Sequence, residues 1–504
     1  MIYLHKNSLL VLFIFLLSFG NLISQVNIKT DSKKILELIE KFSDKDPWVS
    51  GGAIKELVNI GEPAVNYLIK SLQDENENIR WCSAIAIEKI SPLGKQSIPF
   101  LINALKDKNS NVRWCSALAL GKYKSNAPSA ISGLQNLLND EDADVRWAAF
   151  VSILNVNKDA LNVVPEYSDV INTIENLTPE LMEELKVSGV SISIIKNKEL
   201  AWSKSFGVFD TDSKIPVNDK TIFEACSMSK PIFAYLVLNL VDKGKLDLDK
   251  PLYKYLQEEF VCDNEDYPKQ ITARMSLSHT SGLPNWRKGD EERNPPLPIY
   301  FKPGTKFNYS GEGIYYLQRV IEHIVNEPLE SYAKSTLFDK LGLKSTSYVW
   351  TAELDKQIAT GHDADGKKKE RKKYLHSDAA YTLYTTSNEY AKLIIEIMKD
   401  GNKNDYSISD SMKKEMLSHQ VRVDTREVTD RPGRYLGLQG YRGLGWAIDS
   451  TITGDVVYHS GANQTGFRCY SQFSIKDESG IVIMTNGENG SELWQKLIKV
   501  VGDL

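Results

Sequence analysis

The sequence lacks the features that mark several classes of protein. Its five cysteines include no close pair, so a disulfide-rich scaffold is excluded. Its seven histidines form no H-E-x-x-H pattern and no C-x-x-C motif accompanies them, so we expect no metal and no cofactor. The net charge of -5 argues against a nucleic-acid partner. No apolar run reaches the roughly 20 residues that a membrane-spanning helix needs.

The N-terminal residues have the pattern of a secretory signal. Lys6 precedes an apolar stretch at residues 9–19, which is followed by Gly20 and by small or polar residues. This order predicts a signal peptide over residues 1–24 and export to the periplasm or the medium. An uncleaved membrane anchor is the alternative. No cysteine directly follows the apolar stretch, so a lipid anchor is not expected there.

Residues 30–157 contain an internal repeat. Tryptophans, leucines and aspartates each recur at a 33-residue step: Trp48, Trp81, Trp114, Trp147; Leu68, Leu101, Leu134; Asp74, Asp107, Asp140. Three sets in one register indicate a repeat architecture. Each unit has the pattern of two amphipathic helices, and stacked units form a solenoid. The D-x-x-x-x-V/I-R-W pattern resembles short HEAT-type repeats. The unit at Pro47 lacks the arginine and is expected to be a terminal cap.

Two further expectations concern this solenoid. Cys82 and Cys115 occupy equivalent positions in neighbouring units, where packed helices lie about 8–10 Å apart, which is too far for a disulfide. We expect both to be small core residues. A solenoid usually presents a surface to a partner, so a protein partner is one expectation for the repeats. A rigid spacer is the other.

Residues 168–504 are predicted to form an α/β sandwich. A helix is expected at residues 173–185. Residues 190–195 alternate as a half-buried strand, Asn197 marks a turn, and a return strand follows at 200–208. Another strand is expected at 481–484, with helices between, which favours a mixed or antiparallel sheet. The basic run at 367–373 is expected to be a solvated loop.

Three segments of this region carry residues suited to acyl transfer. In F-E-A-C-S-M-S-K-P at 223–231, Ser227 and Lys230 are three residues apart and share a helix face. An unprotonated amine activates a serine hydroxyl as a nucleophile. Tyr309 follows a turn at 303–305, and a phenol takes or gives a proton near an amine. A strand edge at 458–467 offers backbone N–H groups to an oxyanion.

These segments together resemble the serine β-lactamase, D,D-peptidase and esterase superfamily. S-x-x-K, Y-S-x and H-S-G occur in the family's order, and L-D-L-D-K-P at 246–251 and L-S-H-T-S-G-L at 277–283 match further motifs. The resemblance covers residues 170–504. It implies that Ser227 forms an acyl-enzyme while Lys230 and Tyr309 move its proton. It also implies an oxyanion hole from the N–H groups of Ser227 and Ala462, within a substrate-binding strand that contains His459, Ser460 and Gly461.

Two positions depart from the family pattern. Gly311 stands where Y-x-N has a substrate-contacting asparagine, and His459 stands where K-T-G has a lysine. Both favour an esterase or D-peptidase over an efficient β-lactamase. His459 and His279 each have a structural alternative, and Cys226 is expected to be a packing residue.

Three functions remain open. The first is a serine hydrolase for an ester, an amide or a D-amino-acid peptide. The second is an inactive hydrolase fold that serves, with the repeats, as a binding or scaffolding module. The third is a structural protein of the cell envelope. The presence of Ser227, Lys230 and Tyr309 favours the first, because an inactive protein has no need of all three.

Overall fold

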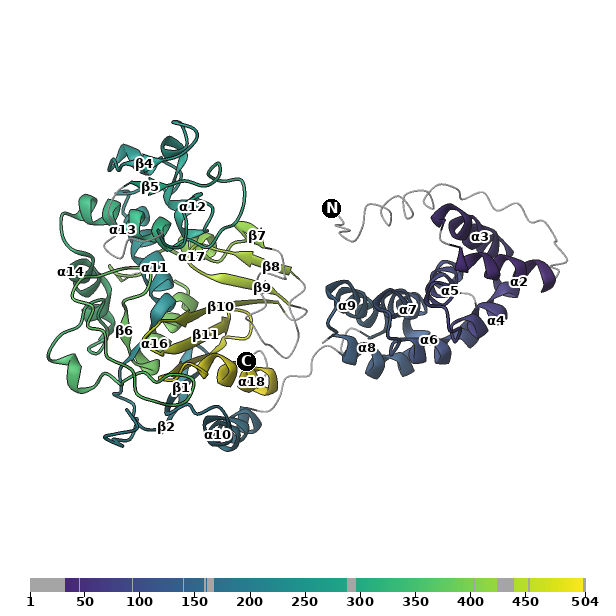
Figure 1. Ribbon diagram of the computed structural model, residues 1–504, viewed down its shortest axis with the longest axis horizontal. Helices are drawn as coiled ribbons and strands as arrows, with labels where there is room; N and C mark the ends of the chain where they lie inside the picture. The colour runs from purple at the N-terminus through teal and green to yellow at the C-terminus, as the bar shows by residue number, and fades with distance from the viewer. Residues whose placement is uncertain are drawn as a thin grey trace. The chain divides into compact units, whose positions relative to one another are not determined.

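The computed structural model divides into two compact units, Met1–Val163 and Val164–Leu504 (Figure 1). It describes residues 32–44, 46–92, 94–138, 140–157, 160, 167–287, 296–401, 404–423, 439–451 and 454–501. The expected signal segment at 1–24 lies outside the described residues. Within the described ranges, no helix combines the length and the apolar character needed to cross a bilayer.

The first unit is built from helices that follow the step of the sequence repeat. α5, α7 and α9 begin at Glu77, Ser110 and Ala143, which are 33 residues apart, so the prediction of a helical repeat is confirmed. The helices are α2 (Ser32–Glu40), α3 (Pro47–Ile60), α4 (Glu62–Ser71), α5 (Glu77–Ile90), α6 (Ile98–Ala104), α7 (Ser110–Lys122), α8 (Ile131–Leu137) and α9 (Ala143–Asn157).

The arginine and aspartate of the repeat join neighbouring units. Arg80 Nε lies 2.7 Å from Asp107 Oδ2, and one unit later Arg113 Nε lies 2.7 Å from Asp140 Oδ2. All four side chains are almost fully buried, so each charge is neutralised within the stack. The sequence pattern therefore encodes the contact between units as well as the helices.

The second unit contains an eight-stranded sheet in the order β2-β1-β12-β11-β10-β9-β8-β7. Every neighbouring pair is antiparallel. The strands are β1 (Gly189–Lys196), β2 (Glu199–Gly207), β7 (Val421–Val423), β8 (Gln439–Arg442), β9 (Ala447–Ser450), β10 (Asp455–Ala462), β11 (Arg468–Ser474) and β12 (Ser479–Thr485). Two short pairs lie outside this sheet: β3 (Phe223–Glu224) with β6 (Tyr384–Thr385), and β4 (Phe260–Val261) with β5 (Leu297–Pro298).

Helices cover both faces of this sheet (Figure 1). α10 and α18 pack on one face, while α11 and α16 pack on the other. The helices are α10 (Tyr167–Glu184), α11 (Ser229–Asp242), α12 (Ala273–Leu277), α13 (Gly311–Val325), α14 (Leu329–Ala333), α15 (Asp339–Leu341), α16 (Ser387–Met398), α17 (Asp410–Met416) and α18 (Gly490–Val501). The predicted α/β sandwich with an antiparallel sheet is confirmed.

The expectation that β1 is half-buried is wrong. Seven of its eight residues are buried. Ile192 packs toward α10 and α18, whereas Ser193 on the opposite side donates a hydrogen bond to Ser387 Oγ of α16 at 2.8 Å. The alternation in the sequence is genuine, but its polar residues face a helix rather than water.

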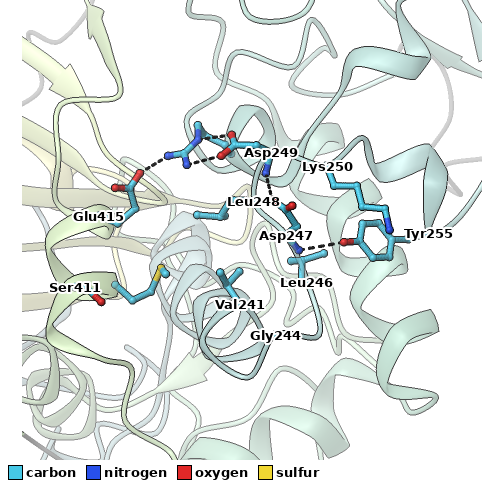
Figure 2. A pocket seen from close by; sticks show the side chains of 12 residues that line it. Val241, Gly244, Leu246, Asp247, Leu248, Asp249, Lys250, Tyr255, Ser411 and Glu415 are labelled. Atoms are coloured by element: carbon cyan, nitrogen blue, oxygen red, sulfur yellow. Dashed lines mark hydrogen bonds and ion pairs between the residues drawn. The ribbon is translucent and has the colours of Figure 1, made fainter.

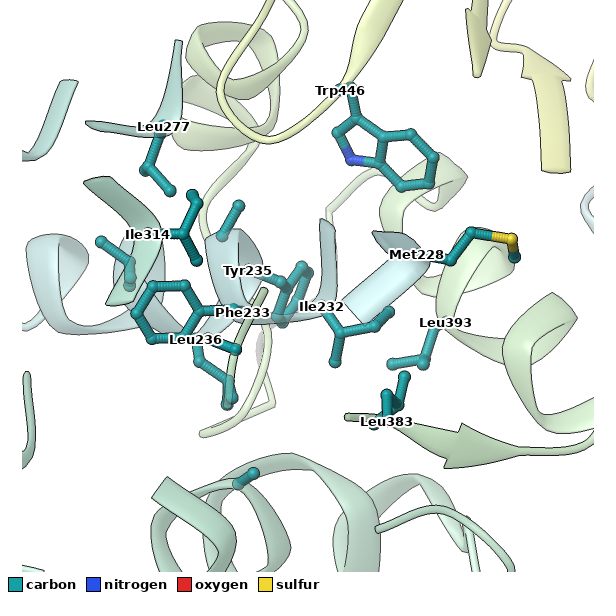
Figure 3. Close-up of a cluster of buried hydrophobic side chains, with 14 of the residues drawn as sticks. Met228, Ile232, Phe233, Tyr235, Leu236, Leu277, Ile314, Leu383, Leu393 and Trp446 are labelled. Atoms are coloured by element: carbon teal, nitrogen blue, oxygen red, sulfur yellow. The ribbon is translucent and has the colours of Figure 1, made fainter. Parts of the chain in front are cut away.

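α11 forms the centre of the larger core. Twelve of its fourteen residues are buried. Its side chains Ile232, Phe233 and Leu236 lie among residues from distant segments, including Ile314 and Leu383 (Figure 3). A helix packed on all sides is difficult to displace. The residues of its first turn, and the turn directly before it, are therefore held rigidly.

Candidate active site

Ser227 lies in a tight turn directly before α11. The 3-10 turn Cys226–Met228 connects β3 to the helix, and Cys226 has φ of 55°, in the left-handed region that non-glycine residues rarely adopt. Ala225 N donates to Leu383 O at 2.7 Å and fastens the turn. The Ser227 side chain is half-buried at the start of the helix.

Lys230 lies within hydrogen-bond distance of the Ser227 hydroxyl. Its Nζ is 3.2 Å from Ser227 Oγ and donates to the carbonyl oxygen of Ala380 at 2.7 Å. The side chain is completely buried. The interpretation that the two residues share one helix face, one turn apart, agrees with this distance. Sequence reasoning missed the Ala380 carbonyl, because a backbone acceptor leaves no trace in the side-chain pattern.

Tyr309 comes to the same place from a separate segment. Its ring centroid is 4.8 Å from Lys230 Nζ. Its ring also packs on His279, at 4.3 Å between centroids. His279 Nδ1 accepts a hydrogen bond from Ser310 N at 3.1 Å. Burial lowers the pKa of His279 well below its usual value, which keeps the imidazole neutral and Nδ1 free to accept.

Strand β10 passes directly against the backbone of the nucleophile turn. A Cβ atom at Gly461 would lie 2.4 Å from Ala225 O and 3.2 Å from Ser227 N. Only a glycine therefore allows this approach. Ser460 is half-buried and Ala462 is exposed on either side of it. Ser227 N and the end of β10 are thus close enough to contribute N–H groups to one oxyanion site.

His459 is a neutral hydrogen-bond acceptor in this arrangement. Burial, followed by the charges of Lys230 and Arg442, lowers the pKa of His459 to about 3. Its Nδ1 lies 2.7 Å from Ser460 O, and because a carbonyl only accepts, Nδ1 carries the proton. Nε2 is buried and has no partner among the described residues. A lysine at this position would supply a cation instead.

A cation does reach the site from β8. The Arg442 guanidinium carbon lies 5.0 Å from the centroid of Phe307 and 5.9 Å from that of Tyr309. Across the part of the chain that the structure describes, no carboxylate forms an ion pair with it, and its buried Nε has no partner. Sequence reasoning did not select Arg442, because an isolated arginine on a strand carries no catalytic motif.

Glu224 fastens the turn after β10 to the strand before the nucleophile. Its buried carboxylate accepts hydrogen bonds from Asn463 Nδ2 at 2.8 Å, Thr465 Oγ1 at 2.7 Å and Tyr374 OH at 3.3 Å. Burial raises the pKa of Glu224. Because Asn463 follows Ala462, the carboxylate helps to fix where that end of β10 lies. Its signal was a charged residue within an otherwise apolar segment.

Gly311 is the first residue of α13 and contributes only backbone. Its N–H donates to Asn285 Oδ1 at 3.0 Å. Where the family pattern has a substrate-contacting asparagine, residue 311 therefore offers no side chain.

A hollow lies elsewhere in this unit, away from the candidate catalytic residues (Figure 2). It measures about 700 Å³, and none of the candidate catalytic residues lines it. At its edge Arg274 forms ion pairs with Asp249, at 2.6 Å, and with Glu415. These three charges are thus paired with one another at the edge of the hollow.

The family model described as Beta-lactamase matches residues 174–502. This chain belongs to the Beta-lactamase family. The model for HEAT repeats matches residues 91–153 of this Beta-lactamase family member. The two matches confirm the resemblances drawn from the sequence. Relatives in the family are serine hydrolases, and the second unit has that fold.

Individual similarities are distant. Protein flp of Staphylococcus aureus strain N315 is 23% identical over 345 residues, which span 66% of this chain and 66% of that protein. The penicillin-binding protein homologue from Pyrococcus abyssi is 21% identical, with a TM-score of 0.55, over 66% of this chain and 78% of that chain. The D-alanine carboxypeptidase AmpC from Burkholderia cenocepacia is 18% identical, with a TM-score of 0.53, over 66% of this chain and 100% of that chain. These likenesses establish the fold alone.

Proposed function

We propose that this protein is a serine hydrolase that works through an acyl-enzyme. Ser227 Oγ attacks the carbonyl carbon of an ester, an amide or a D-amino-acid peptide. Its proton passes to Lys230 or Tyr309 and then to the leaving group as the scissile bond breaks. Water, deprotonated by the same groups, then releases the acyl group from Ser227. The N–H groups of Ser227 and Ala462 bind the oxyanion of each tetrahedral intermediate.

One observation carries the proposal. Three groups meet in one place. Ser227 Oγ lies 3.2 Å from Lys230 Nζ, and the ring centroid of Tyr309 lies 4.8 Å from the same atom. Ser227 and Lys230 come from the start of a helix, and Tyr309 comes from a remote segment. A fully buried lysine without a carboxylate partner among the described residues is costly to maintain. Such an arrangement is typical of a site where the amine acts on the neighbouring hydroxyl.

The site favours esters or D-peptides over β-lactams. Gly311 offers no side-chain amide to a substrate, and His459 offers a neutral acceptor rather than a cation. Both groups differ from those that the family resemblance associates with efficient β-lactam binding. We therefore place the substrate among simple carboxylic esters and D-amino-acid peptides.

Covalent labelling tests the proposal. A fluorescent fluorophosphonate reacts with an activated serine, and a labelled penicillin reports the family-specific acylation. The wild-type chain is expected to take up the fluorophosphonate, and Ser227→Ala is expected to lose all label. Ser411→Ala removes an exposed hydroxyl beside the hollow that no candidate catalytic residue lines, and it is the control for unspecific labelling. If folded wild-type protein takes up no label, or if Ser227→Ala labels equally, the proposal is wrong.

A binding or scaffolding role is the second candidate. Trp48 and Trp147 are exposed by 64% and 42%, although they occupy a repeated position of the solenoid. Stacked repeats present extended surfaces to partners, and these two side chains would lie on such a surface. Unlabelled, folded protein in the experiment above would favour this function.

A further inference from the structure

The indole of Trp286 fills the space beside Gly311. A Cβ atom at Gly311 would lie 3.0 Å from Trp286 Cη2 and Cζ3, and 2.7 Å from Asn285 O. No side chain fits at residue 311 unless both the ring and the backbone move. Residue 311, two positions after Tyr309, has no side chain. The ring of Trp286, which comes from another segment, occupies that space instead.

The residues on either side of Trp286 hold the ring in place. Asn285 Oδ1 accepts the Gly311 N–H at 3.0 Å. Arg287 forms an ion pair with Glu312 at 3.0 Å, in which the side chains are only 7% and 1% exposed. Both anchors bind the first two residues of α13. Trp286 is nevertheless 44% exposed, so part of its ring surface is accessible on an anchored segment.

A second aromatic ring extends this surface. Tyr381 meets Trp286 edge to face, with 5.5 Å between centroids. Tyr381 directly follows Ala380, whose carbonyl accepts the hydrogen bond from Lys230. Trp286 and Tyr381, which we term the aromatic wall, are thus attached to the segments that position Lys230 and Tyr309.

Binding to a preformed aromatic surface is most favourable in free energy when the bound group is apolar. The ring is already ordered, so little conformational entropy is lost on binding. An aromatic or branched aliphatic group displaces water from the ring with no polar cost. An amide placed against the same ring loses hydrogen bonds to water that the ring faces do not replace. The surface therefore discriminates between two groups of similar shape.

We propose that the substrate is a carboxylic ester whose apolar acyl group packs on Trp286, rather than a compound with an acylamino side chain. This inference rests on the proposed hydrolase function of the same site. It makes Trp286 a specificity-determining residue. It also gives a reason for glycine at 311, because any larger residue would displace the ring.

Two esters of equal shape test the inference. p-Nitrophenyl 4-methylpentanoate and p-nitrophenyl N-acetylglycinate differ only in that the second carries an amide in its acyl group. The wild-type enzyme is expected to show a kcat/KM at least about tenfold higher for the apolar ester, mainly through a lower KM. Trp286→Ala is expected to reduce that ratio to near one, while Trp286→Phe retains most of it. Trp147→Ala removes a tryptophan of similar exposure from the repeat unit and is expected to leave the ratio unchanged.

A binding measurement on wild-type protein does not depend on any variant folding. Boronic acids add reversibly to a serine hydroxyl, so 3-methylbutylboronic acid and acetamidomethylboronic acid reproduce the two acyl groups. Tighter binding of the apolar compound supports the inference, and equal or weaker binding overturns it. If Ser227-dependent turnover is present but the amide ester is preferred or equal, this inference alone is wrong. If neither ester is turned over, the hydrolase proposal itself fails.

Discussion

The two units of this protein treat buried charge in opposite ways. In the repeats, the cations of Arg80 and Arg113 each meet a carboxylate of the next unit at 2.7 Å. In the second unit, Lys230 is completely buried and Arg442 reaches the same site, yet within the described residues neither forms an ion pair. The arginines of the repeats hold helices together, whereas the basic groups of the candidate site have no carboxylate partner among the described residues.

This difference separates structural from functional charge. A buried ion pair satisfies both partners and leaves nothing for chemistry. A buried basic group without an anion is tolerated only where surrounding structure holds it, and such groups are typical of functional sites. α11, packed on all sides, provides that support for Lys230.

The strongest test of the unpaired Lys230 amine is its removal. Lys230→Met is expected to lower kcat/KM for p-nitrophenyl esters by about 10²–10⁴-fold, because the proton of Ser227 loses its acceptor. Tyr309→Phe is expected to lower it by about 10²-fold or more. Steady-state hydrolysis measures both, with circular dichroism to verify folding. Rates equal to wild type in either variant would remove that residue from the mechanism.

The matching test in the repeats removes a paired arginine and measures the stability of the stacked helices. Arg113→Met leaves Asp140 buried without a cation and is expected to destabilise the stacked helices by about 3–5 kcal/mol. Hydrogen exchange of α7 and α9 measures the loss. Glu141→Gln removes an exposed contact to the same arginine, so its expected effect is below about 1 kcal/mol. Similar losses in the two variants would contradict the structural role of the buried pair.

Glu224 is expected to act by fixing the position of the turn after β10. Glu224→Leu removes the acceptor for Asn463 and Thr465 and is expected to lower kcat by about 10–100-fold, since a displaced oxyanion donor slows the chemical step. KM is expected to change less. Glu224→Gln keeps an acceptor oxygen and is expected to recover most of the rate. A loss confined to thermal stability, with normal kcat, would make this carboxylate purely structural.

The last expected effect concerns the pH dependence of stability. The pKa of His459 is about 3 in the folded protein and near 6.5 in an unfolded chain. The unfolded state therefore binds more protons between these values, and stability falls as pH drops below about 6.5. His459→Asn is expected to reduce that slope by up to about 1.4 kcal/mol per pH unit. Denaturant unfolding at several pH values measures it, and an unchanged slope would contradict the burial of a neutral imidazole.

Much of the fold was predictable because its signals are local. The 33-residue step gave the positions of α5, α7 and α9, and alternation gave β1 and β2. The exposure of β1 was predicted wrongly, because alternation reports two different faces but not which of them meets water. That depends on α16, which lies about 200 residues further along the chain.

The site was predictable only in part. Ser227, Lys230 and Tyr309 have distinctive motifs, and the structure brings them together. Arg442, Glu224 and Trp286 have none. Their importance follows from contacts across the fold: Trp286 against Gly311, and Glu224 against the turn after β10.

The amino-acid order alone determined the repeat, the family and the three groups suited to acyl transfer, because spacing along a helix or strand is a local property. Tertiary structure decided which cations are paired, that His459 is neutral, and that an aromatic ring occupies the space beside Gly311. These depend on burial and on distances between segments far apart in the chain, and both arise only when the chain is packed.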